Sequence, residues 1–319
     1  MKLFIGLVVV LILAAFSGWL ALRAPDIPYQ VLEAKYANSD SHFVDLPGGV
    51  HLHYRDEGRV DRPLLLLVHG FGDSLWTWDG WVETLKSKFH IIRIDLPGHG
   101  LTRAPANYRL SAETYADLID DFAAKRSLPK FAIAGNSLGG GVAWQLALRH
   151  PDRVDALILV DAAGWPSKAS AKSPPLAFRI LQYRIGREFL KTIDNKPLII
   201  DSLKSEVGDK FVITPALVDR WAELQRVPGH RDILLSTSLS GQSFASKEKL
   251  DQIRIPTLVL WGQIDPLLSV EDGHKFADAI TGSRLIVYPH VGHLPQIEIP
   301  ERSATDVAEF LTSIAASRK

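Results

Sequence analysis

The chain alternates short apolar runs with segments of helical pattern, and this alternation limits the folds that it can adopt. Runs such as Leu64–Val68, Ala156–Val160 and Thr257–Trp261 are almost continuously apolar, as is typical of strands covered on both faces of a parallel sheet. Segments of helical pattern, including Ser111–Arg126 and Leu138–His150, separate these runs. The alternation predicts a mostly parallel sheet with helices on both faces.

Further elements continue the same pattern. His42–Leu46 and Val50–Arg55 flank the turn Pro47-Gly48-Gly49, and we expect them to form a hairpin. The remaining predicted strands are His90–Ile94, Phe131–Ala134 and Leu285–Tyr288. The remaining predicted helices of the sheet domain are Trp78–Lys88, Val270–Ala279 and Glu301–Ala316.

One interval interrupts the alternation. Between Val160 and Thr257 the sequence contains no convincing strand, but helical patterns occur over residues 176–190, 214–226 and about 231–239. A structureless loop of this length is uncommon in a compact domain. We therefore predict a helical cap over residues 164–250, inserted between two parts of the sheet domain, residues 41–163 and 251–319.

The N-terminal segment is strongly apolar. Leu3 to Leu22 carry no charge, and 20 residues of helix span about 30 Å, the thickness of a bilayer's hydrocarbon core. This predicts a transmembrane anchor over residues 1–23 with Trp19 at an interface, a linker over residues 24–40, and an exported, periplasmic catalytic domain. A cleaved signal peptide is the alternative, although Ala21-Leu22-Arg23 is a poor cleavage site.

The composition excludes several classes of function. Lys and Arg together number 36, as do Asp and Glu, so no basic surface indicates nucleic-acid binding. Cysteine is absent, which removes disulfides, thiolate metal sites and a cysteine nucleophile.

A glycine-rich stretch surrounds Ser137. The motif Gly135-Asn136-Ser137-Leu138-Gly139 lies after a predicted strand and before a predicted helix. A nucleophile elbow needs this placement, because its tight turn lifts the serine hydroxyl above the sheet and small neighbours let strand and helix approach closely. A glycine-rich turn with a capping serine is the structural alternative.

A serine nucleophile needs a base and an acid that orients the base, and the elbow pattern places them in the order serine, acid, histidine. His293 follows the last predicted strand, and Asp265 follows the strand before it. A carboxylate there holds the imidazole in one tautomer. His290 is the alternative base and Asp161 the alternative acid.

The oxyanion of a tetrahedral intermediate needs N–H donors. The backbone N–H of Leu138 is one candidate, and the N–H of Phe71, in the loop after Leu64–Val68, is the other. Asp95 and His99 belong to a turn and are assigned structural roles. Trp76, Trp78 and Trp81 are expected to pack below the cap, or one of them to line an acyl pocket.

These residues resemble the α/β-hydrolase superfamily, in its cap-bearing branch. The resemblance covers nearly all of residues 40–316 and rests on the motifs H-G-F-G, D-L-P-G-H-G, G-N-S-L-G-G, W-G-Q-I-D-P and G-H-L-P-Q-I-E-I-P. It implies the α/β-hydrolase fold, the triad Ser137, Asp265 and His293, and neither cofactor nor metal. A serine at this elbow departs from the haloalkane dehalogenases and epoxide hydrolases, which use aspartate.

The resemblance leaves the substrate open. An apolar anchor before such a domain is similar to bacterial membrane-bound lipases and monoacylglycerol lipases, which implies a lipophilic ester substrate. Asn136 is similar to the carbon–carbon bond hydrolases, but their G-x-G-P-G loop is missing here, where Gly72 is followed by Asp73. The prediction is an ester hydrolase. Thioester and carbon–carbon substrates, a non-catalytic sensor and the oligomeric state remain open.

Overall fold

An eight-stranded sheet forms the centre of the protein. The computed structural model describes residues 2–166, 176–236 and 244–317. The strand order is β1-β2-β4-β3-β5-β6-β7-β8, and β2 alone runs antiparallel to its neighbours. The strands are β1 (Ser41–Leu46), β2 (Val50–Gly58), β3 (Leu64–Val68), β4 (His90–Ile94), β5 (Phe131–Asn136), β6 (Val154–Val160), β7 (Thr257–Gly262) and β8 (Arg284–Tyr288).

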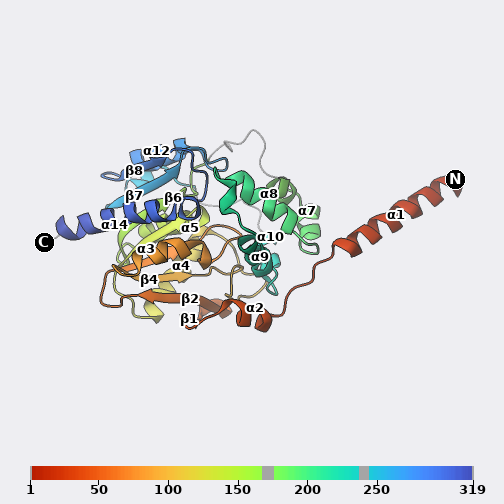
Figure 1. Ribbon diagram of the computed structural model, residues 1–319, viewed down its shortest axis with the longest axis horizontal. Coiled ribbons are helices and arrows are strands. Elements are labelled where there is room, and N and C mark those ends of the chain that lie inside the picture. The colour runs from red at the N-terminus through yellow and green to blue at the C-terminus, as the bar shows by residue number, and fades with distance from the viewer. Residues whose placement is uncertain (1, 167–175, 237–243, 318–319) are drawn as a thin grey trace.

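Helices cover both faces of this sheet (Figure 1). One face carries α4 (Ala112–Lys125), α5 (Leu138–Arg149), α11 (Lys247–Leu250) and α12 (Val270–Ala279). The other carries α3 (Asp79–Leu85) and α14 (Pro300–Ser317). The sheet domain also contains short turns of helix: η1 (Pro47–Gly49), η2 (Leu75–Trp78) and α13 (Pro295–Glu298). The predicted α/β class and mostly parallel sheet are confirmed.

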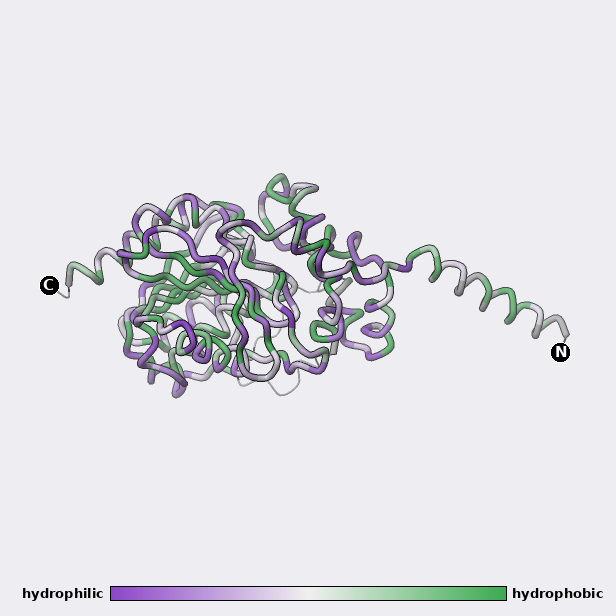
Figure 2. The backbone as a smooth tube through the Cα atoms, turned by 90° about the horizontal axis from the view of Figure 1, so that it is seen from below, coloured by the Kyte–Doolittle hydropathy of each residue, from purple (hydrophilic) through white to green (hydrophobic). Residues whose placement is uncertain are grey.

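The two cores follow from the period of two along each strand. In β3, Leu64, Leu66 and Val68 belong to the core under α4 and α5, while Leu65 and Leu67 belong to the core under α3 and α14. The hydropathy of the backbone trace shows the same interior, with apolar segments gathered in the sheet (Figure 2). Continuous apolar runs in the sequence are therefore strands buried on both faces.

In the described residues between β6 and β7, helices are present in place of strands, as predicted. These inserted helices are α6 (Leu176–Leu181), α7 (Arg184–Leu190), α8 (Lys196–Glu206), η3 (Lys210–Val212), α9 (Pro215–Leu224) and α10 (His230–Ser236). The side chain of Thr214 caps α9 and Pro215 occupies its first turn, as the sequence indicated. The expected helix over residues 176–190 is two helices, and α8 was not predicted. The end of the expected helix 231–239 lies outside the described residues.

The predicted transmembrane anchor is wrong. Among the residues that the structure describes, no helix has both the length and the apolar character to cross a bilayer. Helix α1 (Lys2–Leu22) ends in contacts with the folded body: Trp19 Nε1 donates to Thr192 Oγ1 at 3.0 Å, and the Asp194 N–H donates to the Leu22 carbonyl at 2.8 Å. The prediction of a membrane-anchored, periplasmic protein is corrected with it.

The expected linker contains a short helix, α2 (Tyr29–Tyr36). Its Tyr29 and Leu32 are buried in a small core with Trp76, Leu101 and Leu224. Trp76 therefore lies near the inserted helices, as expected. Trp78 and Trp81 instead pack in the core beneath α14, where Trp81 Nε1 donates to Ser303 Oγ at 2.8 Å.

Candidate active site

Ser137 occupies a strained turn between β5 and α5. Its backbone torsions are φ 53° and ψ −117°, a region that residues with side chains rarely adopt. A Cβ on Gly135 would overlap the Gly139 carbonyl, and a Cβ on Gly139 would overlap the Val68 carbonyl. The glycines are therefore needed for α5 to begin directly against the ends of β3 and β5. The turn has the geometry expected of a nucleophile elbow.

His293 and Asp265 form a buried hydrogen-bonded pair. His293 Nδ1 lies 2.6 Å from Asp265 Oδ2, and both residues are buried. Asp265 Oδ1 accepts the N–H groups of Leu267 and Leu268 at 2.7 and 3.0 Å. These bonds fix the direction of the carboxyl group. Within the described residues, the other ring nitrogen, Nε2, makes no hydrogen bond.

The electrostatics of this pair favour a basic imidazole. Burial by itself would lower the pKa of His293, but the Asp265 carboxylate, and behind it Glu206 and Glu298, raise that pKa above its usual value. A carboxylate beside the ring stabilises the imidazolium that forms when the ring accepts a proton.

A direct contact joins the elbow to the histidine loop. Asn136 Nδ2 donates to the carbonyl oxygens of His293 (3.1 Å) and Val160 (3.2 Å). The residue before Ser137 thus holds the backbone of His293. Within the described residues the Ser137 hydroxyl makes no hydrogen bond of its own, which is common for catalytic groups without substrate.

The loop after β3 lies against Ser137. A Cβ on Gly70 would be 3.3 Å from the Ser137 Cβ, tighter than ordinary van der Waals contact. Leu138 is the first residue of α5, where backbone N–H groups have no partner within the helix. In the part of the chain that the structure covers, neither the Phe71 nor the Leu138 N–H donates to a protein acceptor. Their role as oxyanion donors stays a prediction.

The alternative base, His290, and the alternative acid, Asp161, have different surroundings. His290 is exposed at the surface, and the structure brings His293 to Asp265 instead. Asp161 is fully buried beside the pair: ligand atoms of Asp161, Asp265 and His293 lie within 4.8 Å of one another. Among the described residues, this trio is the group close enough to hold a metal ion.

Asp95 has the structural surroundings that the sequence indicated. It is fully buried and accepts hydrogen bonds from His53 Nδ1 at 2.7 Å and from the N–H groups of Leu75 and Leu101 at 2.8 and 2.9 Å. His99 is also buried, with its ring 4.8 Å from that of His69. Asp95 therefore joins β2 to two loops.

The inserted helices contact the loop after β3 and the loop that carries His293. Gln225, after α9, donates from Nε2 to the Gly72 carbonyl at 3.0 Å. On the other side, the His293 N–H donates to the carbonyl of Glu206, the last residue of α8, at 2.7 Å. Glu298 accepts the N–H groups of Gly292 and Gly208, at 2.8 and 2.7 Å.

Sequence reasoning missed these supporting residues. Glu206 and Glu298 show no local pattern that distinguishes them from surface glutamates, since their role depends on chain segments that meet only in the fold. The one available signal is the position of Glu298 in the stretch that follows His293.

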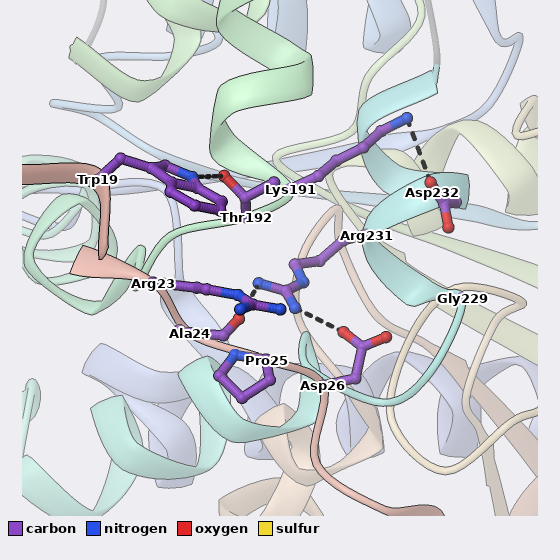
Figure 3. Close-up of a pocket in the computed structure, with 10 residues that line it drawn as sticks. All are labelled: Trp19, Arg23, Ala24, Pro25, Asp26, Lys191, Thr192, Gly229, Arg231 and Asp232. Carbon is purple, nitrogen blue, oxygen red and sulfur yellow. Dashed lines mark hydrogen bonds and ion pairs between the residues drawn. The ribbon is translucent and has the colours of Figure 1, made fainter. Parts of the chain in front are cut away.

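A separate pocket of about 300 Å³ lies between the end of α1 and the inserted helices. Figure 3 shows its walls: Arg231 bonds Asp26 and the Ala24 carbonyl, and Lys191 pairs with Asp232. Its lining contains none of the predicted site residues. The pocket is therefore distinct from the Ser137 site, and its charged groups are largely paired with one another.

The mostly parallel sheet and its helices have the α/β-hydrolase fold. Residues 63–195 match the family model described as the alpha/beta hydrolase fold. The chain belongs to the α/β-hydrolase family.

Similar proteins include several hydrolases. Monoacylglycerol lipase abhd6-B of Xenopus laevis is 26% identical, over 81% of this chain and 77% of its own length. A 2-hydroxy-6-oxo-6-(2'-aminophenyl)hexa-2,4-dienoic acid hydrolase of Metapseudomonas resinovorans is 28% identical, over 83% and 89%. The crystal structure of a membrane phospholipase A matches with a TM-score of 0.73 and 25% identity, covering 99% of both chains.

Proposed function

We propose that this protein is a serine hydrolase that cleaves carboxylic esters through an acyl-enzyme on Ser137. The observation that carries the proposal is the strained backbone of Ser137 (φ 53°) in a chain that also pairs His293 with a buried Asp265 at 2.6 Å. An ordinary glycine-rich turn needs neither the strain nor the pair.

The reaction would run in two halves. His293 Nε2 takes the hydroxyl proton of Ser137 while Oγ attacks the ester carbonyl carbon. The N–H groups of Phe71 and Leu138 bind the oxyanion, the imidazolium protonates the departing alcohol, and the acyl group stays on Oγ. Water then repeats the sequence, giving its proton to His293, and releases the carboxylic acid and free Ser137.

Lipophilic esters are the substrate class that we propose. The support comes from relatives named as a monoacylglycerol lipase and a membrane phospholipase A. The second candidate is a carbon–carbon bond hydrolase, supported by the ring-cleavage hydrolase among the relatives and by Asn136 before the nucleophile. Its G-x-G-P-G loop is absent, which favours esters. A thioester would react by the same steps.

The test measures ester hydrolysis in the wild type and in Ser137→Ala. With p-nitrophenyl acyl esters of increasing chain length, we expect Ser137→Ala to lose at least about 10⁴-fold in kcat/KM while keeping its circular dichroism spectrum. The exposed Ser87 supplies the matched control, because Ser87→Ala alters the same group before the start of β4, at the opposite end of the parallel strands from the elbow. Undiminished turnover by Ser137→Ala would refute the assignment.

A fluorophosphonate probe separates an enzyme from a binding protein that has only kept the fold. Such a probe labels an activated serine, so it is expected to label the wild type and not Ser137→Ala. An unlabelled wild type would point to a disarmed site.

A further inference from the structure

Asp161 is a fully buried carboxyl group that the proposed reaction does not use. It follows β6, its exposure is 0%, and its Oδ1 accepts the Gly262 N–H at 2.8 Å. In the described part of the chain, no donor reaches its other oxygen, Oδ2. A buried oxygen without a partner is costly for an ionised carboxylate, but not for a carboxylic acid that donates its own proton.

The nearest acceptor for that proton is Asp265. Ligand atoms of Asp161, Asp265 and His293 lie within 4.8 Å of one another. Two buried carboxyl groups this close repel each other when both are charged, and a proton on one of them removes that repulsion.

The hydrogen bonds distinguish the two carboxyl groups. Asp265 receives donors from two backbone N–H groups and from His293. Asp161 receives a single backbone donor.

The surroundings of Asp161 also favour its neutral form. Burial first, and then the charge of Asp265, raise the pKa of Asp161 well above its usual range. Glu298 adds to this effect, Tyr288 lies near on β8, and His293 is the one basic group of the trio.

We infer that Asp161 is a positioning residue: its neutral carboxyl group donates a hydrogen bond from Oδ2 to the carboxylate of Asp265. This inference rests on the proposed function. The hydrogen bond holds the carboxylate in place and draws part of its charge away from the imidazole. Asp161 thereby lowers the basicity of His293 without touching substrate.

Two substitutions test this role through the pH dependence of kcat/KM. Asparagine keeps an N–H donor at the same place, and it tolerates the left-handed backbone of Asp161 (φ 42°). We expect Asp161→Asn to leave the acidic limb of the profile within about 0.3 pH unit of the wild type, since no charge is removed. Asp161→Ala removes the donor, and its acidic limb is expected about 0.5–1 unit higher.

A charged Asp161 predicts the opposite result. Asp161→Asn would then remove a negative charge near His293, and the limb would move about one unit or more to lower pH. That shift would overturn the inference. Asp152→Asn, an exposed carboxylate at the other end of β6, is the matched control. Loss of hydrolysis on chelation with EDTA, restored by Zn²⁺, would also overturn it, because Asp161 would then be a metal ligand.

Infrared spectroscopy tests the same inference without activity. In protein with isotope-labelled aspartate, a carboxylic C=O band is expected at pH 8 in the wild type and absent in Asp161→Asn. If esters are hydrolysed but no such band exists, the inference fails and the proposed function stands. If the band exists but no ester is cleaved and no probe binds Ser137, the proposed function fails.

Discussion

Several residues of this protein have an unusual backbone conformation or environment, because groups from several helices, strands and loops surround each of them. Ser137 and Asp265 were predictable as site residues from the spacing of motifs and strand ends, although their roles stay predictions. The network around them was not predictable, because Asn136, Glu206 and Glu298 act on His293 from three separate segments. No pattern within one segment contains that information.

Asp73, in the loop that carries Phe71, also has an environment that depends on the fold. Burial raises its pKa to about 7, against about 3.9 in an unfolded chain. The folded state therefore binds the extra proton between these values, and stability is lost as the pH rises from about 4 through 7. We expect Asp73→Asn to gain stability over the wild type by up to about 1.4 kcal/mol per pH unit in this window.

Urea denaturation at pH 4.5 to 8 measures this gain. Asp61→Asn is the control, since a hydrogen bond from Arg59 lowers the pKa of Asp61 and no gain with rising pH is expected there. A difference between Asp73→Asn and wild type that stays constant with pH would contradict the prediction.

Elements differed in how far their sequences revealed them. The bounds of β3 agree with its apolar run, because a strand buried on both faces needs apolar residues throughout. Helix α8 was missed because its residues are half-buried on several sides and show no single apolar stripe. Helix α2 was missed for a related reason, since only Tyr29 and Leu32 of its eight residues are buried.

The contact between α9 and the loop after β3 predicts a kinetic effect. Gln225 holds the Gly72 carbonyl, next to Phe71, so its removal should loosen a proposed oxyanion donor. We expect Gln225→Leu to lower kcat/KM by about tenfold, equivalent to about 1.4 kcal/mol, which is typical of one lost hydrogen bond.

The matched control is Gln252→Leu, because Gln252 also donates to a backbone carbonyl, that of Glu248, on an exposed surface. We expect that variant to keep the wild-type rate. Equal rates in Gln225→Leu and wild type would show that the inserted helices do not support this loop.

At the scale of the whole molecule, the N-terminal segment fastens the inserted helices to the sheet domain. Arg226 donates to the Pro25 carbonyl at 3.0 and 2.8 Å, and Arg231 pairs with Asp26 at 2.6 Å. Helix α2 then adds Tyr29 and Leu32 to a core shared with η2 and α9. The sequence did not reveal this arrangement, since two prolines and mixed polar residues are typical of linkers.

Substitution of Leu32 tests how much this fastening contributes. Leu32 is 1% exposed, and Leu32→Ala is expected to lower the free energy of unfolding by about 2–5 kcal/mol, as for other buried leucines. Its neighbour Val31 is 55% exposed, so Val31→Ala should change stability by no more than about 0.5 kcal/mol. Chemical denaturation measures the free energy of unfolding of both variants. A similar loss of stability in the two would contradict the prediction.

The two ends of the chain lie on opposite sides of the body (Figure 1). Helix α14 leads to the C-terminus away from the inserted helices, whereas α1 leaves beside them. Attachment of the protein to a bead or a sensor chip through its C-terminal end would consequently leave the inserted helices turned toward the solution. Attachment through the N-terminal end would crowd the same face against the support.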